Sequence, residues 1–137
     1  MIVADTSFMY ALLDRNDNQH SSASNWYLRT DETVCTTSLV IAEIDYLVNS
    51  RLGSHATKAL YKDVSDGAYL IQGSQDIVLQ AIEIASKYSS IGLTDASLVI
   101  VAAEFNTNVI ATFDENHFRM IKPITKHEHF VLAPIDM

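Results

Sequence analysis

The chain has few of the residues that mark disulfide-bonded, metal-stapled or irregular proteins. Its 137 residues include one cysteine, four glycines and two prolines. A single cysteine excludes an internal disulfide framework and any zinc site built from several cysteines. Because 48% of the residues are hydrophobic, the composition does not fit a disordered, collagen-like or low-complexity chain. Residues 1–137 are therefore expected to form one domain with its own core.

Long hydrophobic segments are also missing. The longest apolar run, Leu98 to Ala103, is far shorter than the ~20 residues that cross a bilayer. The first residues carry no basic segment, and the acid Asp5 follows soon after, so the pattern of a secretory signal is absent. With the lone cysteine, these features predict a cytoplasmic protein without a membrane partner.

Positive charge is scarce. Nine lysines and arginines stand against seventeen acids, which gives a net charge of −8 and a pI near 4.8. Most nucleic-acid-binding proteins show the opposite, a broad basic surface. RNA or DNA is therefore a plausible partner only if several acids converge and hold divalent cations.

Short apolar segments alternate with amphipathic or apolar segments of helical length. Alternation of this kind predicts an α/β fold in which helices cover both faces of a mostly parallel sheet. The expected strands are 2–4, 33–36, 68–71, 108–112 and 130–132. The expected helices are 6–13, 17–30, 38–52, 54–66, 75–88 and 94–105.

Three acids lie where predicted strands end or helices begin. Asp5 follows the first strand, Asp114 follows the strand at 108–112, and Asp95 lies in the first turn of the helix opened by Thr94. Function gathers beyond the carboxyl ends of parallel strands. Each acid is equally suited to capping a helix N-terminus, where it satisfies amide donors and the macrodipole. Position alone leaves both interpretations open.

Glu43 has a different setting, in the middle of a predicted helix. Its neighbours one turn away are Leu39 and Leu47, so its carboxylate is expected on the stripe that faces the core. A buried carboxylate costs several kcal/mol unless it is paired or bound to a metal. Glu43 is therefore a candidate metal ligand. The alternative is a buried ion pair with an arginine, although Arg51 lies too far along the helix to be the obvious partner.

Convergence of these acids would demand a cation. Two carboxylates 4 Å apart repel by about 4 kcal/mol at an effective dielectric near 20. An oxygen-only ligand set selects Mg²⁺ or Mn²⁺ rather than zinc. Such ions activate a water and stabilise the charge that builds on a phosphodiester during displacement.

Four segments carry these acids. Each motif is weak alone, but four in this order and spacing are specific, and they span the chain. They are Ile2-Val3-Ala4-Asp5-Thr6-Ser7, Ser38 to Ile44, Leu93-Thr94-Asp95-Ala96 and Ala111 to Phe118. On these motifs the sequence resembles the PIN domain family, and most of all its VapC-type toxins from toxin–antitoxin pairs.

The resemblance implies a PIN-like three-layer α/β/α fold and an endoribonuclease that depends on Mg²⁺ or Mn²⁺. It also implies a homodimer that cuts RNA when free of a small cognate antitoxin. Some relatives carry a further acid where this chain has Asn116, which argues against a second tightly held ion. The resemblance makes Asp5, Glu43, Asp95 and Asp114 the metal ligands and catalytic centre, with Thr6, Thr112 and Asn116 in support.

The basic residues and histidines are further candidates for contact with RNA or metal. Arg51, Lys58, Lys62, Arg119, Lys122 and Lys126 are candidate contacts to RNA phosphates, although solvated surface is the simpler account of each. His117 is expected to be an exposed histidine. The tract from Lys126 to His129 lacks the spacing of a zinc motif and fits alternation on an edge strand.

Two other functions remain as alternatives. A receiver-like phosphoacceptor domain fits the length and the segment Ile121-Lys122-Pro123, but the third strand is followed by Gln72 and Gly73 instead of an aspartate. A non-catalytic interaction module on a PIN scaffold is the other alternative. The presence of acids in all four motifs argues against it.

Overall fold

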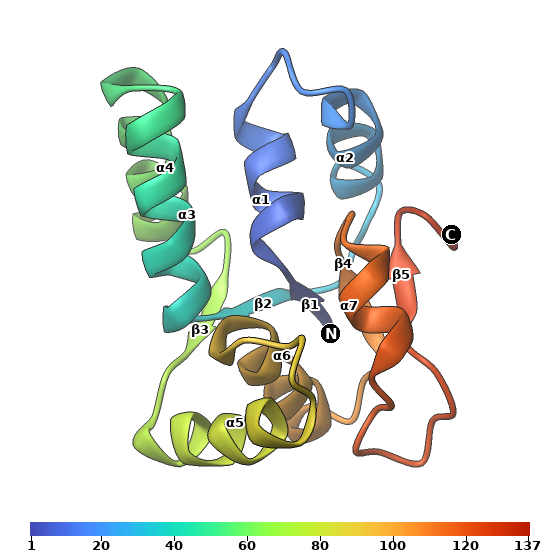
Figure 1. The fold of residues 1–137 in the computed structure, drawn as a ribbon. Helices are drawn as coiled ribbons and strands as arrows, with labels where there is room; N and C mark the ends of the chain where they lie inside the picture. Colours follow the sequence, from blue (N-terminus) through green and yellow to red (C-terminus); the bar gives the residue numbers. More distant parts are fainter.

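Five short parallel strands form the centre of the computed structural model, which describes residues 1–137 (Figure 1). The order across the sheet is β3-β2-β1-β4-β5, and every neighbouring pair is parallel. The prediction of a mostly parallel α/β sheet is confirmed. The strands are β1 (Ile2–Ala4), β2 (Val34–Thr37), β3 (Leu70–Gln72), β4 (Val109–Ala111) and β5 (Val131–Ala133).

Seven helices surround the sheet. In Figure 1, α1 to α4 lie on one side of the sheet and α5 and α6 lie on the other. None of these helices combines the length and the apolar character that crossing a bilayer requires. The helices are α1 (Thr6–Leu13), α2 (His20–Tyr27), α3 (Ser38–Arg51), α4 (Ser54–Ser65), α5 (Gln75–Lys87), α6 (Leu93–Glu104) and α7 (Glu115–Met120).

The core explains why the central elements are so apolar. All three residues of β1 are buried, because helices cover both faces of the sheet. Helix α6 is buried continuously over residues 96–102. Helix α3 buries every fourth residue, Val40, Ile44 and Val48, which fixes the direction in which its other faces point.

Some element boundaries differ from the sequence prediction. Helix α2 begins at His20 because Asp17 closes a turn before it, where its Oδ1 accepts from Gln19 N at 2.7 Å. Thr37, rather than Ser38, caps α3 and accepts from Val40 N. Helix α7 was not predicted at all. It has six residues, too few to show a helical period.

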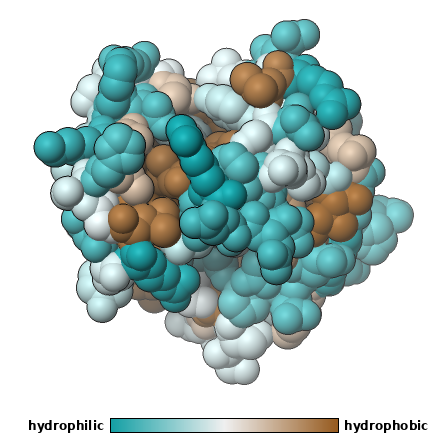
Figure 2. All heavy atoms as spheres, turned by 90° about the horizontal axis from the view of Figure 1, so that it is seen from above, coloured by the Kyte–Doolittle hydropathy of each residue, from teal (hydrophilic) through white to brown (hydrophobic).

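Much of the outer surface is polar. The face seen from above in Figure 2 is mostly hydrophilic, and its hydrophobic side chains form small, separate groups. Scattered apolar residues of this kind are normal on a soluble surface.

The strand register brings two predicted site segments together. Ala4 of β1 pairs with Ala111 of β4, and Asp5 N donates to Ala111 O at 2.9 Å. The residues that follow these strands, Asp5 and Thr112, therefore lie at the same edge of the sheet.

Candidate active site

Asp5 occupies the corner where β1 ends and α1 begins. Its Oδ1 accepts from Thr6 N at 2.6 Å, so the carboxylate caps α1. Its Oδ2 accepts from Ser7 Oγ at 2.9 Å and from Thr112 Oγ1 at 2.6 Å. Capping and a role in the site are therefore compatible, because the carboxylate has two oxygens and several lone pairs.

Two hydroxyl groups tie this corner to the segment after β4. Thr112 Oγ1 accepts from Asp114 N at 2.9 Å, and Ser7 Oγ accepts from Phe113 N at 3.0 Å. The two oxygens are 3.1 Å apart. Thr112 thus orients Asp5. Ser7 also orients Asp5 through its hydrogen bond to Oδ2. Ser7 was not predicted to have this role, and its position two residues after Asp5 was the only indication in the sequence.

Burial sets the electrostatics of Asp5. The residue is 4% exposed, and this desolvation raises its pKa. The hydrogen bonds from Thr112, Ser7 and Thr6 act against the rise, whereas the charge of Asp114 adds to it. A cation in the cavity would stabilise the charged form of this carboxylate.

Asp95 and Asp114 approach each other from two elements, with His117 between them. Asp95 comes from the first turn of α6, and Asp114 caps α7, where its Oδ1 accepts from His117 N at 3.2 Å. His117 Nδ1 lies 2.6 Å from Asp95 Oδ2 and 3.0 Å from Asp114 Oδ2. The expectation of an exposed His117 was wrong, because the capping turn of α7 directs this half-buried side chain towards both acids.

Asp95 is strongly perturbed by its surroundings. Burial raises its pKa to about 6, and the charges of Asp5 and Asp114 add to the rise while His117 acts against it. A carboxyl group with a shift of this size, next to other acids in a cavity, is typical of a functional site.

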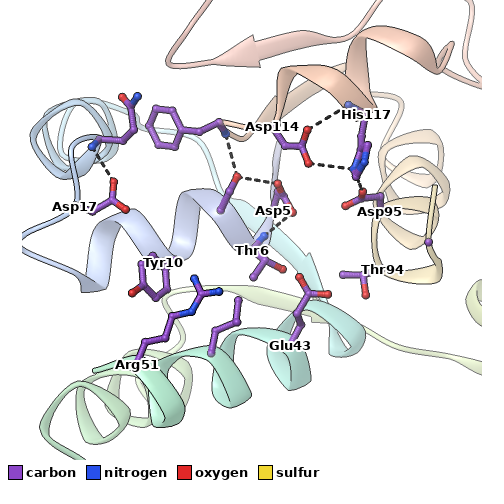
Figure 3. A pocket seen from close by; sticks show the side chains of 15 residues that line it. Asp5, Thr6, Tyr10, Asp17, Glu43, Arg51, Thr94, Asp95, Asp114 and His117 are labelled. Atoms are coloured by element: carbon purple, nitrogen blue, oxygen red, sulfur yellow. Dashed lines mark hydrogen bonds and ion pairs between the residues drawn. The ribbon is translucent and has the colours of Figure 1, made fainter. Parts of the chain in front are cut away.

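Glu43 belongs to the same cavity but not to the core. The core stripe of α3 is Val40, Ile44 and Val48, so the expectation that Glu43 faces the core was wrong. Its side chain is exposed and leaves the helix one position earlier than Ile44. Figure 3 shows its carboxylate pointing into the space that Asp5 borders.

All four predicted acids line one cavity of about 530 Å³. Figure 3 shows them entering it from α3, from the β1–α1 corner, from α6 and from the start of α7. Further lining residues include Thr6 and Ser7 next to Asp5, and Tyr10, Asp17 and Arg51 at the other end. Neither Tyr10 nor Asp17 was predicted to belong to the site, because nothing in the sequence distinguishes them from ordinary helix and turn residues.

The residues of this cavity fit a divalent cation. Thr6 Oγ1 is the one buried side-chain polar atom without a hydrogen-bond partner, and Thr6 lines the cavity. Asp95, Asp114 and His117 each offer a ligand atom, and these atoms lie within 4.8 Å of one another. Oxygen-rich donor sets with unsatisfied polar neighbours suit Mg²⁺ or Mn²⁺.

Only one predicted RNA contact lies in the cavity. Arg51 lines it, and its guanidinium carbon is 5.6 Å from the centroid of the Tyr10 ring. Arg119 instead forms a two-pronged pair with Asp136, at 2.8 and 2.6 Å. Lys62 pairs with Asp66 at 2.5 Å. The exposed residues Lys58, Lys122, Lys126 and Asn116 do not line the cavity.

Comparison with known proteins identifies the family. The model of the PIN domain family matches residues 2–122. The chain belongs to the PIN domain family. A curated relative, ribonuclease VapC26 of Mycobacterium tuberculosis, is 32% identical over 127 residues, which cover 90% of this chain and 93% of the relative.

Solved structures show the same PIN fold. VapC20 of Mycobacterium tuberculosis, described as a toxin that cleaves the sarcin–ricin loop, superposes with a TM-score of 0.79 at 24% identity, over 85% of this chain and 92% of its own. A toxin–antitoxin complex from Klebsiella pneumoniae gives a TM-score of 0.68 at 18% identity, over 93% and 99%.

These comparisons confirm the family predicted from the sequence motifs. Membership in the PIN family, with a ribonuclease as a relative, supports the nuclease interpretation and does not favour the receiver-like alternative. In this PIN domain the four motif acids line a single cavity, which is the arrangement that a metal-dependent nuclease needs.

Proposed function

We propose that this PIN domain is an endoribonuclease that depends on Mg²⁺ or Mn²⁺ and is the toxin of a toxin–antitoxin pair. The observation that carries the proposal is the meeting of Asp5, Glu43, Asp95 and Asp114 in one cavity at the edge of a parallel sheet. Helix capping accounts for the positions of Asp5 and Asp114 taken singly, but it does not explain why Glu43 and Asp95 enter the same cavity.

The four acids would coordinate the ion, and neighbouring hydroxyl groups would orient the acids through hydrogen bonds. A bound Mg²⁺ or Mn²⁺ supplies a Lewis acid that activates a water and offsets charge on the phosphate. Thr112 and Ser7 fix the orientation of Asp5 through hydrogen bonds of 2.6 and 2.9 Å. Thr6 Oγ1, which has no partner in the protein, is placed to bond a water or the ion's shell.

The charge of the chain makes RNA binding dependent on the ion. With a net charge of −8 and five acids in the cavity lining, the protein would repel a polyanion unless a cation intervened. Arg51 is the cavity's one arginine or lysine, and we assign it a contact with a phosphate next to the one that is cleaved.

The proposed partners follow from the relatives and from charge. One structural neighbour is a toxin–antitoxin complex, and a basic segment of a small antitoxin would find complementary charge on this acidic chain. A homodimer and a cytoplasmic location complete the proposal, as the family resemblance and the lone buried cysteine indicate.

A cleavage assay tests the proposal. Purified protein is incubated with defined single-stranded and hairpin RNAs, without added metal, with Mn²⁺ or Mg²⁺, and with EDTA after metal. We expect cleavage only with metal and its loss with EDTA. In parallel, metal should raise the melting temperature, because a ligand that binds only the folded state stabilises it by ~2.7 kcal/mol at 100 times its Kd.

Two results would contradict the proposal. Cleavage that persists in EDTA after extensive dialysis would remove the metal from the mechanism. An absence of cleavage on all RNAs, with no change of melting temperature at millimolar metal, would favour the non-catalytic interaction module instead.

A further inference from the structure

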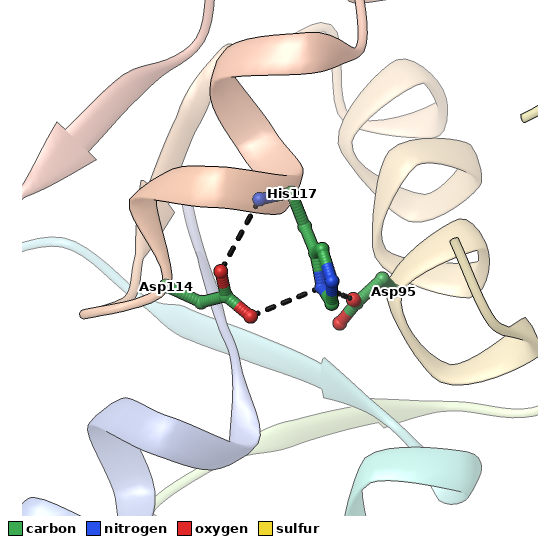
Figure 4. Close-up of side chains that lie close together, drawn as sticks. All are labelled: Asp95, Asp114 and His117. Carbon is green, nitrogen blue, oxygen red and sulfur yellow. Dashed lines mark hydrogen bonds and ion pairs between the residues drawn. The ribbon is translucent and has the colours of Figure 1, made fainter. Parts of the chain in front are cut away.

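His117 is the one cavity residue that brings a nitrogen ligand to the acids. It projects from α7 between two carboxylates that belong to different elements (Figure 4). Its Nδ1 lies 2.6 Å from Asp95 Oδ2 and 3.0 Å from Asp114 Oδ2. The same turn fixes the ring's position, since Asp114 Oδ1 accepts from His117 N.

The spacing of these three groups is close to that of the ligand atoms around a small divalent ion. Their ligand atoms all lie within 4.8 Å of one another. In an octahedral shell with bonds of ~2.1 Å, adjacent ligand atoms are ~3 Å apart and opposite ones ~4.2 Å apart. An ion could therefore take these three ligands with only small movements of the side chains.

A second, independent feature of the cavity also indicates a ligand. Thr6 Oγ1 is buried and has no hydrogen-bond partner, and Thr6 is only 4% exposed while it lines the same cavity. Buried hydroxyl groups normally find a partner. The cavity is thus incomplete at this point without a bound water or ion.

We infer that His117 Nδ1 is a ligand of the bound ion and makes the site prefer Mn²⁺ over Mg²⁺. The inference rests on the proposed function, because it concerns the ion of that same site. Without an ion, His117 Nδ1 shares a hydrogen bond of 2.6 Å with Asp95 Oδ2. As a ligand the ring would carry its hydrogen on Nε2 and direct the Nδ1 lone pair to the ion.

The preference follows from ligand chemistry. Carboxylate oxygens serve Mg²⁺ and Mn²⁺ alike, whereas an imidazole nitrogen binds first-row transition ions better than it binds Mg²⁺. A nitrogen ligand added to the four acids, in the place of a water oxygen, therefore raises affinity for Mn²⁺ more than for Mg²⁺.

The other histidines offer a matched control. His55 on α4 and His129 are exposed, His20 Nδ1 is bonded to Ala11 O at 2.7 Å, and His127 is bonded to Thr125. None of them lines the cavity. His55→Gln therefore changes a histidine of the same chain without touching the site.

Metal binding by the full chain tests the inference directly. Wild type, His117→Gln and His55→Gln are titrated with Mn²⁺ and with Mg²⁺ by calorimetry, and the Mn²⁺ complexes are examined by pulsed EPR for coupling to an imidazole nitrogen. We expect coupling in wild type and in His55→Gln but not in His117→Gln. In His117→Gln, Mn²⁺ affinity should fall ~10-fold or more and Mg²⁺ affinity less than ~3-fold.

A second variant covers the case in which His117→Gln folds poorly. His117→Asp keeps a ligand but makes it oxygen, so metal binding should persist while the preference for Mn²⁺ is lost. Equal losses for both ions in His117→Gln, or no nitrogen coupling in wild type, would overturn the inference.

The inference and the proposed function fail in different ways. If wild type binds neither ion, the proposed metal centre fails and takes the inference with it. If both ions bind, Asp95→Asn abolishes binding, and the ratio of affinities is unchanged in His117→Gln, only the inference is wrong.

Discussion

The two sides of the cavity are built in opposite ways. On one side, Asp5 is 4% exposed and accepts three hydrogen bonds, from Thr6, Ser7 and Thr112. On the other side, α3 presents Glu43 and Arg51, which are both exposed. Neither of these two takes part in any ion pair of the structure.

The two sides therefore differ in how far the protein has oriented their side chains before an ion binds. The Asp5 side is fixed by the fold, and a carboxylate that is already oriented needs no reorganisation when an ion binds. The α3 side stays solvated, so its side chains can adapt to ion and substrate. Substitutions on the fixed side should therefore affect chemistry and pH-dependent stability, and those on the open side should affect binding with little change in stability.

The largest effect is expected at the fixed side. Asp5→Asn removes the buried charge that the ion needs, so the cleavage rate should fall by ~10³-fold while the circular dichroism spectrum is unchanged. Asp76→Asn, on the exposed first turn of α5, is the control and should cleave normally. Full activity in Asp5→Asn would remove this residue from the centre.

The next effect concerns pH and Asp95. Because its pKa rises from 3.8 to about 6 on folding, the folded chain binds more protons than the unfolded chain between these values, and stability falls as pH rises from about 4 to about 6. Asp95→Asn should remove this part of the fall and stabilise the metal-free protein at pH 7 by up to about 3 kcal/mol.

Urea unfolding in EDTA, at several pH values, measures this difference. The gap between Asp95→Asn and wild type should open between about pH 4 and pH 6 and stay constant above. A gap that is independent of pH would show that the substitution acts through packing and not through the charge of Asp95.

The sequence predicted the fixed side better than the open side. Asp5 and Asp114 follow buried strands, and parallel strands end at a common edge, so fold class alone places both acids at that edge. The sequence also predicted β1 and α6 well, because all of β1 and residues 96–102 of α6 form unbroken buried runs. These predictions succeeded because the segments are strongly apolar and the sheet is parallel.

The sequence did not predict which of two neighbouring residues on α3 faces the core, nor the short helix α7. Glu43 and Ile44 are neighbours on α3, yet one is exposed and the other buried, and a spacing of four residues fits both stripes. His117 depends on α7, whose six residues give no periodic pattern. The capping turn at Asp114, which aims the imidazole, is visible only in the folded chain.

A smaller effect is expected from Glu43, on the open side. Glu43→Gln should lower cleavage by ~10-fold through weaker ion binding, and more Mn²⁺ should partly restore the rate. Because the side chain is exposed, Glu43→Gln and Glu43→Leu should both change the free energy of unfolding by less than ~0.5 kcal/mol. If Glu43 were a buried, unpaired carboxylate, Glu43→Leu would stabilise the metal-free protein, and we expect no such stabilisation. An increase of several kcal/mol in the free energy of unfolding of Glu43→Leu would show that Glu43 is buried in solution.

The smallest effect is expected from Arg51, which tests whether the open side touches RNA. Arg51→Ala should weaken RNA binding by a few-fold at low salt and reduce the slope of log affinity against log salt by about 1, as for the loss of one phosphate contact. Lys58→Ala, exposed outside the cavity, is the control and should leave the slope unchanged. Binding is measured by fluorescence anisotropy in the presence of the ion, with an RNA whose phosphodiesters are replaced by a cleavage-resistant analogue, so that the metal site and the RNA both stay intact. If both substitutions change the slope equally, the contact with RNA is spread over the surface and the cavity's arginine has no special part in it.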